Sequence, residues 1–148
     1  MNKPVLFLRI ASVLTLMHAV LHTIGGVFGK SDPGPASVAE QAMKMNQFLW
    51  MGNMRSFWDF YRGMGLAVSI FLTFEAIVFW QLGSLAKGHA PQLRPIMAIF
   101  AIAYVVMAVN SYAYFFLAPV IMEFVIAACL VFAIVTAKPQ AAADLTTP

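Results

Sequence analysis

The sequence predicts an all-α membrane protein, in which four transmembrane helices form one bundle and a short amphipathic surface helix lies between the first two spans. Three observations lead to this fold class. The 148 residues are 61% hydrophobic and only 10% charged, whereas about 25% of the residues in a soluble domain are charged. The apolar residues form continuous segments close to or above the length of about 20 residues that a spanning helix needs. Polar segments containing Pro and Gly separate them.

The first two spans are bounded by polar residues. The first is expected at about 5–28, with Lys3 and Arg9 near its start. Its apolar part is too long for a signal peptide, and it lacks an A-x-A cleavage site, so we expect it to be retained. The second span is expected at about 57–82, followed by a polar connection over 81–94.

The last two spans come from one apolar stretch, residues 96–137, which is about twice as long as a single span. Asn110 and Pro119 mark the expected break, and Pro suits the first turn of a helix. The third helix is therefore predicted at about 95–114 and the fourth at about 117–137.

The segment 30–56 is polar enough to leave the bilayer. Ser37, followed three residues later by Glu40, forms a capping-box pattern. We therefore expect a short amphipathic helix at about 38–50 on the membrane surface, with Trp50 at the level of the headgroups.

Four spans place both termini on one side of the membrane. Five of the nine Lys and Arg residues would lie on that side, which favours a cytoplasmic location for both termini. The net charge of +3 does not indicate nucleic acid, because the basic residues flank apolar segments. Residues 1–137 are expected to form a single membrane domain, and 138–148 a disordered tail.

Sulfur chemistry gives weak signals. The single cysteine, Cys129, excludes an internal disulfide and is expected to be a buried thiol. Four methionines of the polar segment could bind Cu(I) through their thioethers, although Met also fills apolar surfaces: Met43, Met45, Met51 and Met54. No metal is predicted, and the sequence names no cofactor.

Four ionisable groups lie inside the apolar segments. His18 and His22 share one face of the first helix, while Glu75 and Glu123 lie in the second and fourth spans. A bilayer makes such groups costly, so each needs a partner, a proton or a ligand. Three interpretations of the histidine pair remain open. Each ring could bond a neighbouring helix or a water molecule, the pair could bind a ligand or handle protons, or it could bind a metal.

Depth along the helices suggests specific partners for these groups. At about 1.5 Å per residue, His22 falls near the depth of Glu123, and His18 near that of Glu75. We therefore expect two histidine–carboxylate pairs. Glu75 has an alternative structural partner in two arginines on the cytoplasmic side, Arg9 and Arg94.

The start of the second span carries a polar stripe. Asp59, Arg62, Ser69 and Thr73 fall within about 80° of one another on a helix. We expect the stripe to face protein, because lipid cannot satisfy it. One interpretation is a capped and anchored helix entrance; the other is that Asp59 and Arg62 line the mouth of a pocket.

The outer end of the third helix adds Asn110, Ser111, Tyr112 and Tyr114. These residues are expected to cluster in the outer half of the bundle with His22, Asp59, Arg62 and Glu123, whereas the inner half has only Glu75. This asymmetry predicts a cavity opening outward or into the outer leaflet. Gly63 and Gly65 would let another helix or a ligand approach the second span closely.

The segment 55–63, Arg-Ser-Phe-Trp-Asp-Phe-Tyr-Arg-Gly, follows the pair His18-x-x-x-His22 and the pair Gly25-Gly26. These motifs resemble a family of small bacterial four-helix membrane proteins without an established activity, over about the first 85 residues. In architecture the chain is also similar to DoxX-type and emopamil-binding-like proteins. The latter include sterol isomerases and lipid-binding receptors with acidic residues in an intramembrane pocket, which implies a site of that kind here.

The favoured hypothesis is that the protein binds a lipid-like, sterol-like or quinone-like molecule in an outer-half pocket lined by His and carboxylates. The alternatives are a small membrane enzyme that uses His and Glu for proton transfer, of isomerase or oxidoreductase type, and an accessory subunit whose polar groups meet a membrane partner or a second copy. The candidate site residues are His18, His22, Asp59, Arg62, Glu75, Asn110 and Glu123.

Overall fold

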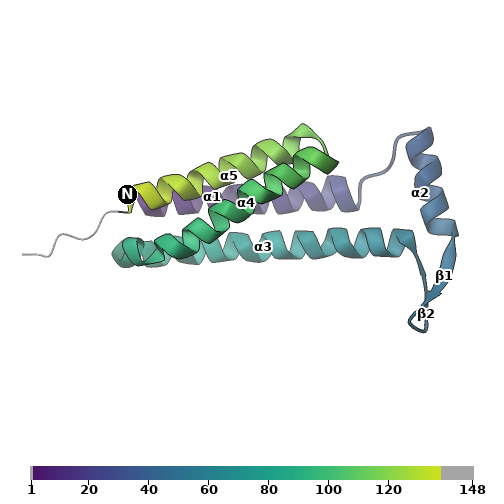
Figure 1. The fold of residues 1–148 in the computed structure, drawn as a ribbon, viewed down its shortest axis with the longest axis horizontal. Coiled ribbons are helices and arrows are strands. Elements are labelled where there is room, and N and C mark those ends of the chain that lie inside the picture. Colours follow the sequence, from purple (N-terminus) through teal and green to yellow (C-terminus); the bar gives the residue numbers. More distant parts are fainter. Residues whose placement is uncertain (1, 138–148) are drawn as a thin grey trace, which may run out of the picture. The chain divides into compact units, whose positions relative to one another are not determined.

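The computed structural model describes residues 2–137, so the predicted tail at 138–148 lies outside the described residues. Helices dominate the chain (Figure 1). In order, the elements are α1 (Lys3–Leu21), a π-helix (His22–Val27), α2 (Pro35–Met45), β1 (Gln47–Trp50), β2 (Asn53–Ser56), α3 (Phe57–His89), a 3-10 turn (Ala90–Leu93), α4 (Arg94–Tyr114) and α5 (Leu117–Thr136).

The chain divides into two compact units. The first, called unit 1 below, contains the residues up to 16 and those from 74 onward. The second, unit 2, contains residues 17–73. The helices α1 and α3 each contribute one part to each unit.

Three helical stretches are long and apolar enough to cross a membrane: Lys3–Val27, Phe57–Tyr114 and Leu117–Thr136. The second stretch contains both α3 and α4, joined by the 3-10 turn. Helices therefore carry all the strongly apolar parts of the described chain, as the composition predicted.

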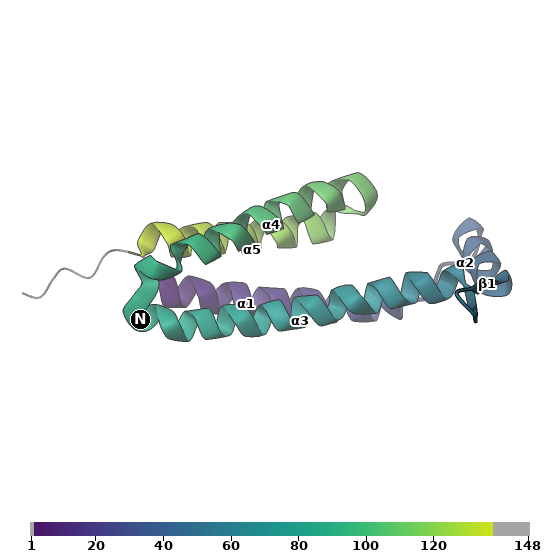
Figure 2. The same cartoon turned by 60° about the horizontal axis from the view of Figure 1, so that its bottom comes forward.

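The hydrophobic core lies in unit 1, where α4 and α5 pair along their lengths (Figure 2). Its largest fully buried side chains come from four helices: Leu8, Phe79, Met97, Ile126 and Leu130. Phe79 meets the ring of Phe100 edge-on at 5.0 Å between centroids. This arrangement is favourable for two aromatic rings.

One face of α4 is buried and the opposite face is apolar and exposed. The buried positions recur every three or four residues: Met97, Ala101, Tyr104, Ala108 and Ser111. The exposed face carries Ile99, Ile102, Val106 and Val109, each more than 60% exposed. An exposed face of β-branched apolar residues is unfavourable in water and suits lipid.

Two of the predicted helices have accurate ends, and a third was predicted to end too early. The helices α4 and α5 match the expected spans within one residue at each end. The helical conformation is interrupted between them at Phe115–Phe116. The helix α3 continues to His89, seven residues beyond the predicted end at 82. Hydropathy locates the apolar part of a helix, and a helix can continue through polar residues such as Gln81 and Lys87.

The surface helix predicted at about 38–50 is wrong in its second half. The helix α2 ends at Met45, where Asn46 adopts an extended conformation. Residues 47–56 instead form an antiparallel hairpin, with Leu49 opposite Met54. Its turn places Met51 and Gly52 at positive φ, 48° and 84°, as type I′ hairpin turns require.

The start of α2 also differs from the predicted capping box. The helix begins at Pro35, and Gly34 rather than Ser37 is the N-cap residue. The Ser37 hydroxyl accepts a hydrogen bond from the Gly34 N–H at 3.2 Å. Glu40 pairs with Lys44, one turn later on the same helix. Pro35 defines the helix start because its fixed φ favours the first helical position.

Candidate functional site

The first polar cluster lies in unit 1 and joins three helices. The Tyr104 hydroxyl, from α4, donates to Glu75 Oε2, from α3, at 2.8 Å. Thr15 Oγ1, from α1, lies 3.3 Å from the Tyr104 oxygen. Because Tyr104 uses its proton on the carboxylate, Thr15 is the donor in the second hydrogen bond. Both Thr15 and Tyr104 are buried, so this chain of hydrogen bonds forms away from water.

The second carboxylate of unit 1, Glu123, is only 2% exposed. The Ser111 hydroxyl donates to its Oε1 at 3.0 Å. Its other oxygen, Oε2, is buried and has no hydrogen-bond partner among residues 2–137. A buried carboxylate oxygen without a partner is costly, so this atom has capacity for a further hydrogen bond.

The two clusters share one face of α4. Tyr104 and Ser111 are seven residues apart, which is two helical turns, or about 10 Å along the axis. Each directs its hydroxyl to a carboxylate of another helix, Glu75 or Glu123. The sequence placed Ser111 and Glu123 only in the same half of the bundle, and the structure joins them by a direct hydrogen bond. Tyr104 was missed, although its three- and four-residue spacing to the other buried positions of α4 would have placed it on this face.

The polar cluster of unit 2 surrounds Ser69 in α3. Its Oγ lies 3.0 Å from His22 Nδ1, 2.8 Å from Thr23 Oγ1 and 3.2 Å from the Gly65 carbonyl oxygen. Thr23 Oγ1 also lies 2.7 Å from the Ala19 carbonyl oxygen, so each hydroxyl has more acceptors within reach than its single proton can serve. The tautomer of the His22 ring decides whether Nδ1 donates to Ser69 or accepts from it.

His18 lies one turn earlier on α1 and is buried. Its Nδ1 has no hydrogen-bond partner within the described part of the chain. The predicted pairing of His18 with Glu75, and of His22 with Glu123, stays a prediction. The donors identified for the two glutamates are the hydroxyls of Tyr104 and Ser111.

A π-helix follows directly after the histidines, at His22–Val27. The Phe28 N–H bonds the Thr23 carbonyl, five residues back, at 3.1 Å. The chain then turns so tightly that a Cβ on Gly29 would lie 2.0 Å from the Gly25 oxygen, which only glycine permits. Such π-helical turns are rare and often occur at functional sites.

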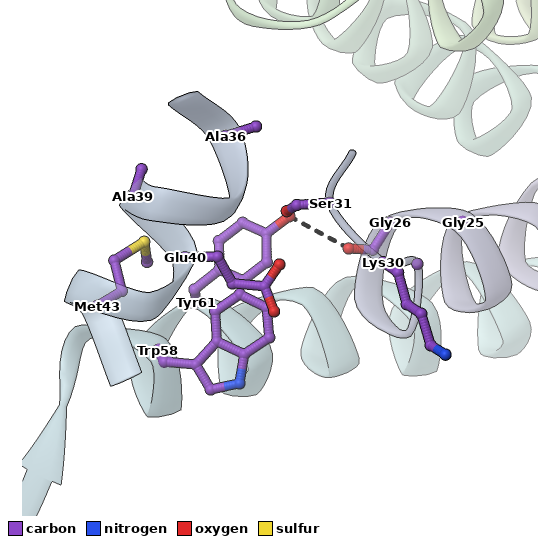
Figure 3. A pocket seen from close by; sticks show the side chains of 11 residues that line it. Gly25, Gly26, Lys30, Ser31, Ala36, Ala39, Glu40, Met43, Trp58 and Tyr61 are labelled. Atoms are coloured by element: carbon purple, nitrogen blue, oxygen red, sulfur yellow. Dashed lines mark hydrogen bonds between the residues drawn. The ribbon is translucent and has the colours of Figure 1, made fainter. Parts of the chain in front are cut away.

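A shallow hollow of about 250 Å³ lies beside this turn, between the π-helix, α2 and the start of α3 (Figure 3). Trp58 and Tyr61 stack at 5.3 Å between ring centroids. Tyr61 donates to the Gly26 carbonyl at 3.2 Å. Glu40 is one of the residues that line the hollow. None of the seven candidate site residues predicted from the sequence lines it.

Lys44 contacts two of the residues that line this hollow, Glu40 and Trp58. Its ammonium group pairs with Glu40 and lies 4.4 Å from the centroid of the Trp58 ring. The hydrogen bond from Lys44, followed by those from Ser31, holds the pKa of Glu40 below its ordinary value. Glu40 is therefore a carboxylate at neutral pH, paired with a cation of its own helix.

The polar stripe of α3 does not face inward as a whole, so that prediction is wrong for Asp59 and Thr73. Ser69 is buried, but these two side chains are exposed. Each satisfies itself locally. Asp59 accepts from the Ser56 N–H and hydroxyl, at 2.8 and 3.0 Å. Thr73 donates to the Ser69 carbonyl at 2.8 Å.

The remaining polar candidates lie apart from these clusters. Arg62 stacks over the Phe28 ring, 4.9 Å from its centroid, and Asn110 is exposed on α4. The arginines considered as partners of Glu75 bind elsewhere. Arg9 donates to Ser84 at 2.9 Å and stacks on Trp80, and Arg94 donates to the Ala137 carbonyl.

The described residues contain no group of three His, Cys, Asp or Glu side chains that could hold a metal ion. Cys129 is a buried free thiol, as expected. The copper hypothesis for the methionines stays a prediction.

No protein-family model, curated protein or solved structure matches this chain.

Proposed function

We propose that α1, α3, α4 and α5 each cross a bacterial inner membrane, with both termini in the cytoplasm. The stretch Phe57–Tyr114 has 58 residues, which corresponds to about 87 Å of helix. The hydrocarbon core is about 30 Å thick, so this length supports two spans that meet at the 3-10 turn. Reporter fusions at residues 35 and 148 should report opposite sides of the membrane. Reports from the same side would contradict four spans.

We further propose that the protein binds a small lipid-like or quinone-like molecule through Glu123. The observation that carries this proposal is the buried Oε2 of Glu123, which has no partner among the described residues. The likeness to emopamil-binding-like proteins, which have acidic residues in intramembrane pockets, supports the same kind of ligand.

The carboxyl group restricts the chemistry of the ligand head. An ionised Glu123 would accept from a hydroxyl or an ammonium group, whereas a protonated one would donate to a carbonyl such as that of a quinone. In both states Ser111 holds the Oε1 side of the group, which orients Oε2 toward the ligand. The rest of such a molecule would contact apolar side chains and lipid.

Mass spectrometry of small molecules that copurify in mild detergent tests this proposal. The wild-type protein should retain one class of amphiphile, and Glu123→Gln should lose it while keeping its helical circular dichroism. Glu40→Gln makes the same chemical change outside the spanning helices and is the matched control. Equal retention by all three proteins would contradict a role for Glu123.

A second candidate function, proton transfer in a membrane enzyme, is favoured by the hydrogen-bond chain Thr15–Tyr104–Glu75. A tyrosine bonded to a carboxylate can pass a proton to a bound substrate. Conversion of the copurified molecule by the wild-type protein, but not by Tyr104→Phe, would favour this function over binding alone.

A further inference from the structure

The hairpin β1–β2 presents an exposed apolar edge. Its outward side chains are Leu49, Met51 and Met54, which are 69%, 88% and 55% exposed. Leu49 and Met54 are opposite each other in the hairpin and so share one face, while Met51 forms the tip. An exposed apolar edge next to polar loops indicates an interaction surface.

The opposite face holds the hairpin to α3. Phe48 packs against Phe57 and Phe60, at 5.0 and 6.2 Å between ring centroids. Trp50 meets Phe60 edge-on at 6.0 Å. Because successive side chains of a strand alternate between faces, anchoring Phe48 and Trp50 directs Leu49 outward. The aromatic contacts therefore fix the orientation of the apolar edge.

The covalent connection fixes the depth of the hairpin. The strand β2 ends at Ser56, and α3 begins at the next residue, so no linker separates them. Figure 1 shows the hairpin running across the axis of α3 at this end. It therefore stays near the level of the first turn of α3, whatever the rotation of the helix.

The length of α3 is enough for that first turn to lie among the lipid headgroups when the helix crosses the bilayer. Its 33 residues correspond to about 50 Å, which exceeds the full bilayer thickness of about 40–45 Å. The first turn carries Phe57, Trp58 and Tyr61, aromatic residues typical of the membrane–water interface. Arg55, an exposed base in β2 of the hairpin, suits anionic headgroups.

We propose that the hairpin 47–56 is a membrane-interface anchor, with Leu49, Met51 and Met54 inserted between lipids at the headgroup–acyl boundary. The occupant of this surface is the lipid bilayer, and the anchor would set the depth and rotation of α3. The inference rests on the proposed crossing of the membrane by α3, so the experiment measures that crossing separately.

The test places a fluorescent NBD label at single cysteines in a Cys129→Ala background. The full-length protein is reconstituted in vesicles of phosphatidylcholine and phosphatidylglycerol. Met51→Cys and Leu49→Cys probe the edge. Phe71→Cys, at an exposed position of α3, probes the span, and Asp32→Cys probes the polar loop. Quenching is measured with iodide in the water and with nitroxide lipids labelled near the headgroup or at mid-chain.

The expected result is that labels at Met51 and Leu49 are quenched by the nitroxide near the headgroup, and several-fold less by iodide than the label at Asp32. Quenching by iodide alone would show an edge in water, and protection from both quenchers would show an edge covered by protein. Either outcome overturns the proposal. If Phe71 escapes the mid-chain nitroxide, the crossing by α3 fails as well, which separates the two failures.

A measurement on the wild-type protein does not depend on how the labelled variants fold. In wild-type protein in the same vesicles, peroxide should oxidise Met51 at least several-fold more slowly than free N-acetylmethionine amide. Oxidation at the rate of the free amide would show that the tip is in water and would overturn the anchor.

Discussion

The two compact units satisfy their polar groups in different ways. In unit 1, hydroxyls and carboxylates of different helices bond each other, as in Tyr104–Glu75 and Ser111–Glu123. In unit 2, Ser69 contacts His22 of another helix, and hydroxyls also lie within hydrogen-bond distance of carbonyls one turn earlier on their own helix. These pairs are Thr23 with Ala19, Ser69 with Gly65 and Thr73 with Ser69.

Hydrogen bonds between helices couple them, whereas hydroxyl–carbonyl bonds within one helix deform it locally. A hydroxyl that bonds its own helix often bends it, and the π-helix begins at His22, just before Thr23. The pairs of unit 1 that contain carboxylates join α3 to α4 and α4 to α5, and Thr15 adds α1, so they require four helices to be in place at once. The hydrophobic core is also in unit 1, so a change there should cost more than its counterpart in unit 2.

The largest effect is expected when a core side chain of α3 is truncated. Phe79 is fully buried in unit 1, whereas Phe71 in unit 2 is 69% exposed. Phe79→Ala should lower the free energy of unfolding by about 3 kcal/mol, because it removes packing and leaves a cavity. Phe71→Ala, the matched control, should change it little. Unfolding with SDS in mild detergent measures both, and equal losses would contradict the difference between the units.

A smaller effect is expected from the hydrogen-bond chain of unit 1. Tyr104→Phe removes the donor to Glu75 and the acceptor for Thr15. The free energy of unfolding should fall by about 1–2 kcal/mol, the upper range for hydrogen bonds inside membranes. Tyr112→Phe, at an exposed position of the same helix, should have almost no effect. A double-mutant cycle with Glu75→Gln should show coupling, and strict additivity would break the proposed chain.

Close packing in unit 2 predicts an effect of similar or smaller size at one of two glycines. A Cβ on Gly65 would lie 3.0 Å from Val27 Cγ2, while a Cβ on Gly63 would meet nothing within 4 Å. Gly65→Ala should therefore be about 1 kcal/mol less stable than Gly63→Ala, because the neighbouring side chain must shift. Thermal unfolding of the two variants checks this, and equal stability would show that the unit 2 helices do not pack this closely.

The smallest effect is expected from pH. The pKa of Glu40 is lower in the folded protein than its unfolded value of about 4.3. Its pairing with Lys44 therefore stabilises the fold above that value, and the contribution is lost as pH falls through the folded pKa. The stability difference between wild type and Glu40→Gln should be constant near neutral pH and shrink in this acidic window. A difference that grows on acidification would contradict the pairing.

The apolar pattern predicted the helices better than their connections. The break between α4 and α5 was predictable because Pro119 interrupts one long apolar stretch. The hairpin was missed because helical spacing of Val38, Ala42 and Met45 was extended past Asn46. Met51-Gly52 between aromatic and apolar residues would have been the signal for a turn. The π-helix has no comparable signal beyond its two adjacent glycines.

The residues of the site were easier to predict from the sequence than their hydrogen-bond partners. Glu75 and Glu123 were identifiable because charges are costly in lipid, and Ser111 and Glu123 were both expected in the outer half of the bundle. The partner of Glu75 was not, since depth alone cannot show which face of another helix carries a donor such as Tyr104. Asp59 and Thr73 were misplaced because a polar stripe can also satisfy itself on its own helix.

The most direct test of the central claim compares ligand retention in Glu123→Gln and His22→Ala by mass spectrometry in one mild detergent. If the open carboxylate of unit 1 binds the ligand, Glu123→Gln should fold and lose the copurifying amphiphile. His22→Ala should keep it, because His22 bonds Ser69 within unit 2. Retention by Glu123→Gln, or loss by a folded His22→Ala, would contradict a ligand site confined to unit 1. The latter result would favour the histidine–carboxylate pairs predicted from depth.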